Sequence, residues 1–549
     1  MTLSPEAAES LFENIVASFE RGERDTAMRL AVSALEQGLD EPLVLLLAGE
    51  ALEEDGRGAE GIELLLEAAE IAPEEAQVWF CLGTMRIRQG LDEAGLADLE
   101  TALSLQANFL PALANAAAVS YRLGHLTDAE SYYRQLVALD PDSTDALAAL
   151  AAIAARRRDT AQARAMASRA LALQPGNFSA EMAIGRADLI DGEPERVHAR
   201  MDRLLARSGL DDDARVAVLD LRADALDALD RTEAAFADYA SRNAILSQKF
   251  AARMEREVSE RSVDRARRLA RVFSSQAAAP WQRHSAGPDE AGADAGCRHV
   301  FLLSFPRSGT TLLEKVLSSH SDVVALEEVD LLSDIASEWL AQDAGIDALA
   351  ALGPREAAVH RARYWQGVRD ATGVELSGRT VLDKLPLHTL CLPVIARLFP
   401  QAKILFAVRD PRDVVLSCFR RRFQVNPAMY ELLDLRSAAQ FYHEVMNLAE
   451  VCRAVLPIAV WEVRHEQMVE QFEHTVRRVL EFVGLEWQPA LLHFADTLPA
   501  DPRTPSDLQL RRGLNASGLG QWRRYSDPMA PVTDVLAPWV QRYGYTLNG

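Results

Sequence analysis

The chain has few cysteines, no long apolar run and no excess of positive charge, and each shortage argues against a class of protein. Its 549 residues include five cysteines, none in a Cys-x-x-Cys pair, so neither a disulfide framework nor a zinc site is expected. No stretch approaches the roughly 20 consecutive apolar residues of a transmembrane helix. The net charge of −23 disfavours general nucleic-acid binding, because neutralising phosphates requires a basic face.

The N-terminal residues, MTLSPEAAESLFENIV, also lack the basic-then-apolar order of a secretory signal. We therefore expect a cytoplasmic protein that does not enter a membrane. The length predicts about three domains, and a hydrophobic content of 49% is ample for packed cores.

Small residues recur every 34 positions through the N-terminal half of the chain, in several separate phases. Two helices cross closely only where a side chain is small, and glycine tolerates the turn between them. This period resembles the tetratricopeptide repeat over about residues 8 to 210, and predicts an α-helical solenoid that binds a protein partner. Two of the phases are Gly22, Gly56, Gly90, Gly124 and Gly192, interrupted by Arg158, and Gly49, Gly83, Ala117, Ala151 and Gly185.

Changes in composition along the sequence divide the chain into three predicted segments. Residues 1–245 form the helical array, whose last helix pair, LRADALDALDRTEAAFADYASRNAIL, is atypical, as a terminal cap should be. Residues 246–296 hold a charged connecting helix over 246–273 and a linker rich in Ala, Gly, Ser and Pro. Residues 297–549 alternate short apolar strands with helices, which predicts a P-loop-like α/β domain with a parallel sheet and ligands at the strand carboxyl ends. The expected strands are HVFLLSF, DVVAL, TVLDKL, KILFAVR and IAVWEVRHEQMV.

The stretch FPRSGTTLLEKVLSSH (305–320) follows the first of these strands and opens a helix. Such a loop presents backbone N–H groups to an anion at the helix N-terminus. It is not a Walker A motif, because Thr310 follows Gly309 where that motif needs lysine, and Arg307 precedes the turn instead. A nucleotide kinase would also need a carboxylate for Mg²⁺.

This loop, together with KILFAVRDPRDVVLSCFRRRF (403–423), resembles sulfotransferases that use 3′-phosphoadenylyl sulfate (PAPS). The resemblance runs from about residue 298 to 545 and is nearest to the protein-tyrosine and bacterial repeat-containing enzymes. It implies that Arg307 meets the transferring sulfuryl group and that Arg409 and Ser417 hold the 3′-phosphate, without a metal. The nucleotide contacts that it implies are Arg307, Ser308, Gly309, Thr310, Thr311, Arg409, Ser417, Arg421 and, in the C-terminal closing segment, Ser506.

The resemblance also implies the catalytic groups. Lys384, in VLDKLP, would contact the bridging oxygen and the leaving phosphate. The paired acids in VVALEEVDLL would supply the base that takes the acceptor proton, which a nearby carboxylate can do. The register from Arg307 favours Glu328, with Glu327 as the competitor. Sulfotransferases of small hydroxyl compounds often use histidine, for which His320 and His388 are the candidates.

Some positions depart from the pattern. His388 stands where repeat-containing relatives usually have Asn, His465 replaces a Tyr, and Asp330 stands where protein-tyrosine enzymes have an Arg that meets the substrate. We therefore predict transfer of a sulfuryl group from PAPS to a hydroxyl acceptor, with peptide tyrosine, glycan and small molecule all open. The repeats would recruit the acceptor or a protein partner. The alternatives are a P-loop kinase or other phosphotransferase, and a scaffold with an inactive transferase domain.

Overall fold

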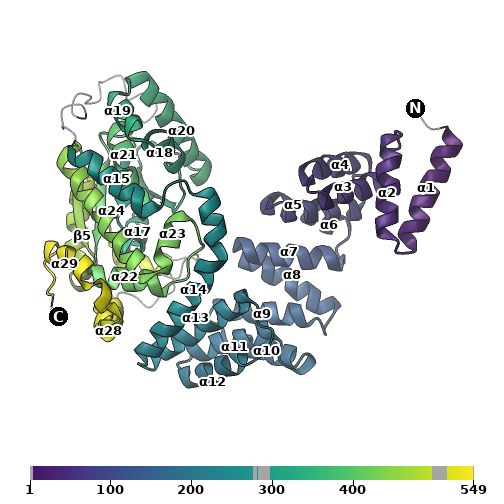
Figure 1. The fold of residues 1–549 in the computed structure, drawn as a ribbon, viewed down its shortest axis with the longest axis horizontal. Helices are drawn as coiled ribbons and strands as arrows, with labels where there is room; N and C mark the ends of the chain where they lie inside the picture. The colour runs from purple at the N-terminus through teal and green to yellow at the C-terminus, as the bar shows by residue number, and fades with distance from the viewer. Residues whose placement is uncertain (1–3, 276–280, 282–296, 498–515, 548–549) are drawn as a thin grey trace. The chain divides into compact units, whose positions relative to one another are not determined.

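The computed structural model describes residues 4–275, 281, 297–497 and 516–547. The backbone divides into two compact units, Met1–Glu193 and Pro194–Gly549, and each is described by itself (Figure 1). Within the described ranges, no helix has both the length and the apolar character that crossing a bilayer requires.

The first unit is a series of helices, each packed against the next along the chain (Figure 1). This confirms the predicted helical array. The helices are α1 Pro5–Glu20, α2 Arg24–Glu36, α3 Pro42–Glu54, α4 Gly58–Ile71, α5 Ala76–Arg88, α6 Asp92–Leu105, α7 Leu110–Leu123, α8 Leu126–Leu139, α9 Thr144–Arg156, α10 Thr160–Leu173 and α11 Phe178–Ile190.

The 34-residue phases have two structural causes. Turn glycines such as Gly56 and Gly90 adopt left-handed backbone angles, with φ of +78° and +81°. Arg158, which interrupts this phase, adopts the same conformation with φ of +65°. A second phase marks close helix crossings: a Cβ atom on Gly83 would lie 2.7 Å from the carbonyl oxygen of Gly95. The repeat in the sequence is therefore a repeat of turns and of crossings.

The second unit begins with four helices that precede the sheet: α12 Pro194–Leu205, α13 Asp212–Ala228, α14 Thr232–Glu257 and α15 Ser262–Ser275. The single connecting helix expected over 246–273 is wrong, because α14 starts at Thr232 and runs to Glu257. Its buried residues Tyr239, Leu246 and Met254 form one continuous face across residue 245. Apart from Trp281, the expected linker over 276–296 lies outside the described residues. The domain boundaries at 245 and 297 stay predictions.

A five-stranded parallel sheet forms the centre of this unit, with the order β2-β3-β1-β4-β5. This confirms the α/β prediction. The last strand is shorter than expected: it ends at Arg464, and α25 (His465–Glu470) follows, where Glu, Gln and Met favour helix. The strands are β1 Arg298–Leu303, β2 Val323–Glu327, β3 Thr380–Lys384, β4 Lys403–Val408 and β5 Ala459–Arg464.

Both faces of the sheet are covered. Phe301 and Leu303 of β1 pack on one face, and Val300 and Leu302 pack on the other. The first face also packs against residues of α13, α14 and α15, so the helices before the sheet share its core. The remaining α-helices of the described residues are α17 Thr310–Ser318, α18 Ser333–Leu340, α19 Asp343–Ala351, α20 Pro354–Thr372, α21 Leu392–Leu398, α22 Pro411–Arg420, α23 Pro427–Tyr430, α24 Leu435–Val455, α26 Phe472–Val483, α28 Ser526–Met529 and α29 Thr533–Arg542.

Candidate active site

The predicted phosphate loop lies at the carboxyl end of the central strand, between β1 and the first turn of α17. Gly309 has φ of +96°, and a Cβ atom there would lie 2.4 Å from Nδ1 of His465, so a side chain is excluded. Arg307 also has a left-handed φ, +69°, which is uncommon for a residue with a side chain and concentrates at functional sites. The loop is therefore held in one strained conformation with its backbone facing the helix N-terminus.

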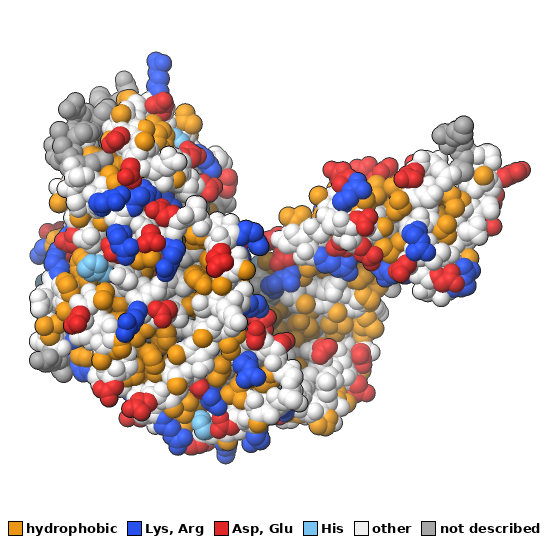
Figure 2. Space-filling view, viewed as in Figure 1, with side chains coloured by type: hydrophobic (Ala, Val, Ile, Leu, Met, Phe, Trp, Pro, Cys, Tyr) orange, Lys and Arg blue, Asp and Glu red, His pale blue; other side chains and the backbone are white. Residues whose placement is uncertain are grey.

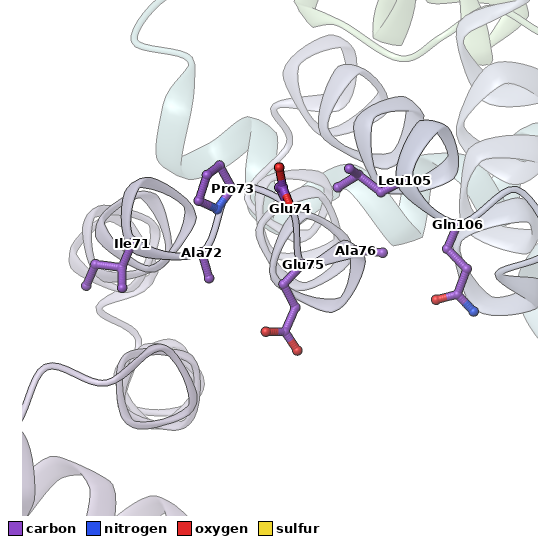
Figure 3. Close-up of a pocket in the computed structure, with 8 residues that line it drawn as sticks. All are labelled: Ile71, Ala72, Pro73, Glu74, Glu75, Ala76, Leu105 and Gln106. Atoms are coloured by element: carbon purple, nitrogen blue, oxygen red, sulfur yellow. The ribbon is translucent and has the colours of Figure 1, made fainter.

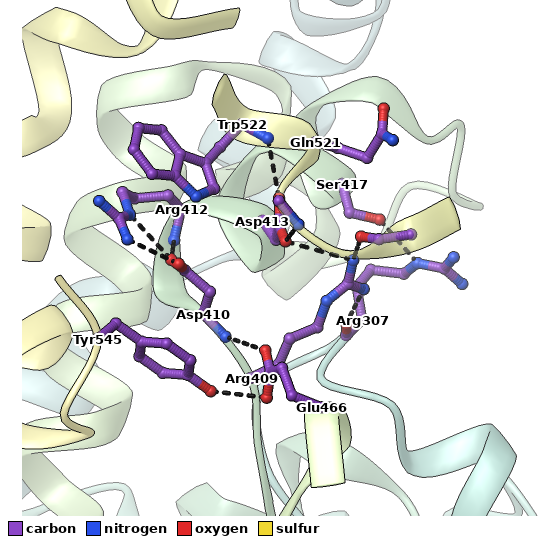
Figure 4. Close-up of polar contacts among 12 residues, drawn as sticks. Arg307, Arg409, Asp410, Arg412, Asp413, Ser417, Glu466, Gln521, Trp522 and Tyr545 are labelled. Atoms are coloured by element: carbon purple, nitrogen blue, oxygen red, sulfur yellow. Dashed lines mark hydrogen bonds and ion pairs between the residues drawn. The ribbon is translucent and has the colours of Figure 1, made fainter. Parts of the chain in front are cut away.

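Arg307, Arg409 and Ser417 meet in one cluster, although they come from three different elements (Figure 4). Nε of Arg307 donates a hydrogen bond to Oγ of Ser417 at 3.1 Å. Nη1 of Arg409, directly after β4, donates to the carbonyl oxygen of Arg307, also at 3.1 Å. Ser417 lies on α22 and closes the cluster. The two sequence motifs thus build one polar centre above the sheet.

The cluster gathers several positive charges in a buried place. Burial, together with the charges of Arg421 and Arg409, lowers the pKa of Arg307 to about 10. Burial, with Arg409 and Arg307, lowers the pKa of His465 to about 3, so its ring is neutral. Among the described residues, Nε of Arg409 and Nδ1 of His465 are buried without a hydrogen-bond partner. Buried cations and unsatisfied polar atoms fit an anionic ligand such as the phosphates of PAPS.

The C-terminal segment around residues 516–525 closes over Arg409 (Figure 4). Nη2 of Arg409 donates to the carbonyl oxygen of Gly518. The carboxylate of Asp413 accepts hydrogen bonds from the backbone N–H groups of Gly520 at 2.6 Å and Trp522 at 2.9 Å. Asp413 also lies 3.9 Å from Arg409. A single carboxylate of α22 therefore anchors this segment beside the arginine.

Asp410 and Arg412 form a second pair next to this segment. Arg412 donates to Asp410 at 2.7 Å, and its guanidinium stacks over the Trp522 ring at 3.6 Å from the centroid. The carboxylate of Asp410 therefore forms its ion pair with Arg412 and not with Arg409. Ser506, which the resemblance places at the nucleotide, lies outside the described residues.

Lys384, the last residue of β3, is buried between two carboxylates. Its Nζ lies 2.6 Å from Oε1 of Glu328 and 3.1 Å from Oε2 of Glu314. Glu328 adopts a left-handed φ of +56°. The competing base, Glu327, instead accepts from Nζ of Lys315 at 2.6 Å. Of the two paired acids, the geometry brings Glu328 to the predicted catalytic lysine.

The histidine candidates for the base have other partners. His320 contacts the Glu486 carbonyl oxygen through Nε2 at 2.9 Å and accepts from the Asp322 N–H through Nδ1 at 3.1 Å. Nε2 of His388 lies 3.1 Å from Asp330. Burial alone would lower the pKa of His388, but Asp383 and Asp330 outweigh burial and raise it to about 9. A protonated His388 cannot accept the acceptor proton.

Several buried residues near the site were not predicted from the sequence. Glu314 lies on α17, and burial raises its pKa to about 7 although Lys384 opposes that rise. Asp383, fully buried in β3, accepts from the Tyr364 hydroxyl at 2.8 Å, which in turn lies 2.9 Å from Nε2 of His299. The sequence did contain a signal for these residues, namely a charged residue within an otherwise apolar strand or helix face. Such a residue indicates a buried charge, and a buried charge needs a partner.

A separate hollow of about 730 Å³ lies in the first unit, where α4 and α6 end (Figure 3). An exposed aliphatic side chain stands at the final residue of each of α4, α6, α8 and α10, and the first of them, Ile71, lines the hollow. The exposed fractions are 49% for Ile71, 41% for Leu105, 43% for Leu139 and 45% for Leu173. Figure 2 shows apolar surface among acidic and basic side chains over these N-terminal helices. The hollow is lined by Ile71, Ala72, Pro73, Glu74, Glu75, Ala76, Leu105 and Gln106.

Comparison with known proteins agrees with the resemblance read from the motifs. Residues 299–489 match the sulfotransferase family. An uncharacterized protein of Aquifex aeolicus is 28% identical over 246 residues, which cover 44% of this chain and 32% of that protein. The protein-tyrosine sulfotransferase of Drosophila melanogaster is 26% identical over 258 residues, which cover 45% of this chain and 51% of that enzyme. The chain thus spans a third to a half of the length of these relatives.

A tetratricopeptide repeat protein from Parabacteroides merdae is similar to the helical array, at 16% identity and a TM-score of 0.35, over 43% of this chain and 93% of that one. The array itself is established here by its own helices and turns. The family match and the parallel sheet fall on the same part of the chain. The part of this chain that matches the sulfotransferase family model is therefore residues 299–489, and the chain is similar to protein-tyrosine sulfotransferases at low identity.

Proposed function

We propose that the chain is a PAPS-dependent sulfotransferase that acts on a hydroxyl acceptor. One observation carries the proposal: the cationic cluster of Arg307 and Arg409 with Ser417 lies at the carboxyl edge of the same sheet that presents Lys384 and Glu328. In parallel α/β sheets ligands bind at this edge. The family match supports the reaction class, and the donor is inferred from the residues present.

The donor nucleotide would be held by two sets of groups. The backbone of Ser308 to Thr311, at the start of α17, would surround the 5′-phosphate, with the hydroxyls of Thr310 and Thr311 adding donors. Arg409 and Ser417 would bind the 3′-phosphate, and Arg421 would add positive charge. The positive charge of the cluster supports this assignment, and a phosphate could accept from Nε of Arg409, which is buried without a hydrogen-bond partner among the described residues.

When bound, PAPS supplies the sulfuryl group, and its nucleotide product is 3′-phosphoadenosine 5′-phosphate (PAP). Glu328 would accept the proton of the acceptor hydroxyl as general base. Lys384 and Arg307 would donate hydrogen bonds to the oxygens on which negative charge develops. Glu314 shares Lys384 with Glu328 and would keep that lysine in place when Glu328 turns to the acceptor. Side-chain cations do the neutralising, so no metal is invoked.

The repeats would recruit a protein, either the acceptor or a partner. The exposed aliphatic side chains at the helix ends support contact with another protein, because exposed apolar side chains that recur in this way favour protein–protein contacts. They are Ile71, Leu105, Leu139 and Leu173. The acceptor class stays open between peptide tyrosine, glycan and small molecule. Asp330, which pairs with His388, lies beside the proposed base Glu328 in the sequence. Its negative charge would repel an acidic peptide, so this position distinguishes the site from one that binds such a peptide.

Calorimetric titration with PAP, AMP and ATP–Mg²⁺, each with and without a chelator, tests the proposal. We expect PAP to bind most tightly and its affinity to be unchanged by the chelator. A kinase would prefer ATP–Mg²⁺ and lose binding in chelator, and this result would overturn the proposal. A scaffold with an inactive domain would bind PAP without turning over PAPS.

A further inference from the structure

Two of the helices that precede the sheet, α13 and α14, contact the end of the helix that carries Ser417. That helix, α22, ends at Arg420. The final carbonyl groups of any helix have no partner within it and need one from outside. Here the partners come from Arg242 and Asn243 of α14, which lie 176 to 178 residues earlier in the chain.

Arg242 is completely buried, and its five N–H donors are all engaged. Nη1 donates to the carbonyl oxygen of Arg420 at 3.1 Å and to Asp220, and Nη2 donates to the carbonyl oxygen of Phe419 at 3.0 Å. Its remaining donors, on Nε and Nη2, both reach Oδ1 of Asn243. The amide of Asn243 then donates to Phe419 as well, at 3.0 Å. The end of α22 is thus capped by two side chains of α14.

The same helix pair holds the arginines at this end of α22. Asp227 of α13 pairs with Arg420, whose guanidinium also lies over the rings of Tyr239 and Tyr525. Burial raises the pKa of Asp224, another α13 carboxyl, while the nearby charge of Arg421 acts to lower it. The charge of Arg421 also lowers the pKa of Arg307 in the phosphate loop. The charge of Arg421 therefore acts on both α13 and the donor cluster.

We infer that Arg242 is a positioning residue of the donor site, and that α13 and α14 are a working part of the transferase and not a tether for it. By fixing the end of α22, Arg242 sets where Ser417 and Arg421 stand relative to the 3′-phosphate. The inference rests on the proposed function, since it assigns the purpose of a helix in that site. It deepens that proposal by linking α13 and α14 to recognition of the 3′-phosphate.

Full-length Arg242→Gln tests the inference by the ratio of PAP to AMP affinity, because AMP lacks the 3′-phosphate. We expect PAP to weaken about five- to tenfold and AMP to change less than about twofold. Arg222→Gln is the matched control, because Arg222 joins α13 to α14 through Asp238 but has no contact with α22 among the described residues. It should leave the PAP to AMP ratio unchanged. Arg242→Lys, which keeps a cation for one carbonyl, should recover part of the loss.

Each outcome distinguishes the inference from the proposed function. If wild-type protein does not bind PAP, the proposed function fails. If wild type binds PAP but a folded Arg242→Gln keeps the wild-type ratio, or Arg222→Gln changes it equally, the inference alone fails. Melting curves report whether each variant is folded. If Arg242→Gln does not fold, Asn243→Ala replaces it, since it removes one donor to Phe419 and should lower the ratio about two- to threefold; an unchanged ratio there overturns the inference.

Discussion

The ammonium of Lys384 lies 2.6 Å from the carboxylate of Glu328, although 56 positions separate the two residues in the chain. Lys384 ends β3, and Glu328 follows β2, the neighbouring parallel strand. The contact joins the residue proposed to stabilise the leaving group to the residue proposed to take the acceptor proton. It also separates Glu328 from Glu327, which pairs with Lys315.

Glu328→Gln should abolish most turnover and leave PAP affinity nearly unchanged. The reason is that the carboxylate acts on the acceptor and not on the nucleotide. Loss of a general base costs about 10²- to 10⁴-fold in rate. Single-turnover release of labelled sulfuryl from PAPS, with PAP titration in parallel, measures both effects.

Glu327→Gln is the control for this substitution, because it changes the adjacent carboxylate in the same way. We expect it to keep at least about a third of wild-type turnover. If Glu327→Gln is the inactive variant and Glu328→Gln is active, the assignment is displaced by one residue. If both are active, neither of the paired acids is the base.

Arg409→Ala should weaken PAP by roughly ten- to a hundredfold and barely affect AMP. A charged hydrogen bond is worth about 1.5–3 kcal/mol, and about 1.4 kcal/mol corresponds to one decade of affinity. Arg409 also contacts Gly518 and lies 3.9 Å from Asp413, so its removal tests recognition and closure together. Calorimetric titration of both nucleotides gives the ratio.

Arg397→Ala is the control for losing a buried arginine. Arg397 lies on α21 and donates to the carbonyl oxygen of Leu352, away from the phosphate loop in the sequence and in its contacts. It should lower the melting temperature without changing the PAP to AMP ratio. Equal loss of PAP and AMP in a folded Arg409→Ala protein would contradict the assignment of Arg409 to the 3′-phosphate.

The sequence predicted the parts of this site that lie within short motifs. The period of 34 residues predicted the turns because each needs a left-handed residue, and the strand-loop-helix order placed Arg307 and Gly309 correctly. The partners across the fold could not be predicted, since Glu314 meets Lys384, and Arg242 meets Phe419, only through tertiary packing. The helix boundary near residue 245 was missed because α14 continues with one unbroken buried face.

The three helices α18, α19 and α20 were not predicted, although they cover residues 333–372. α18 and α19 have only 8 and 9 residues, which is too short for a helical period to stand out, and the apolar residues of α20 are spread among many charged ones. The charge network of Asp330, His388 and Asp383 was also missed. Three residues far apart in the sequence form it, and their types alone do not indicate a contact.

His388 predicts a pH dependence of stability. Its pKa is about 9 in the folded chain against 6.5 ordinarily, since Asp383 and Asp330 outweigh the opposing effect of burial. A histidine whose pKa is raised on folding stabilises the folded state fully below pH 6.5. This contribution to the free energy of unfolding is lost as the pH rises through 9. The loss amounts to about 3 kcal/mol at most, at about 1.4 kcal/mol per pH unit.

Denaturant unfolding of the transferase unit between pH 6 and 9.5 measures this loss. His388→Asn should give a clearly smaller loss of unfolding free energy over the alkaline part of this range, because asparagine does not titrate. A wild-type curve that stays flat, or an equal slope in the variant, would contradict a charged His388 between the two carboxylates. A slope of the opposite sign would show that burial prevails over the carboxylates.

Gly309→Ala should eliminate PAP binding in a chain that still folds. The new Cβ would lie 2.4 Å from His465, and φ of +96° is strained for any residue with a side chain. The double variant Gly309→Ala with His465→Ala removes the ring atoms, leaves the Cβ atom of position 465 at 3.1 Å and keeps the strain, so it should recover binding in part. Gly378→Ala is the control, since Gly378 has φ of +74° but open space around it. Normal PAP affinity in Gly309→Ala would mean that the loop does not bind the phosphate.

The most direct test is transfer of labelled sulfuryl from PAPS to a hydroxyl acceptor in fractionated lysate, with a chelator present. We predict that wild-type protein forms a labelled acceptor together with PAP, and that Glu328→Gln forms neither while still binding PAP. Absence of labelled product from every fraction, in protein that binds PAP, would contradict the proposed transfer. So would label transfer that depends on ATP and Mg²⁺ instead of PAPS.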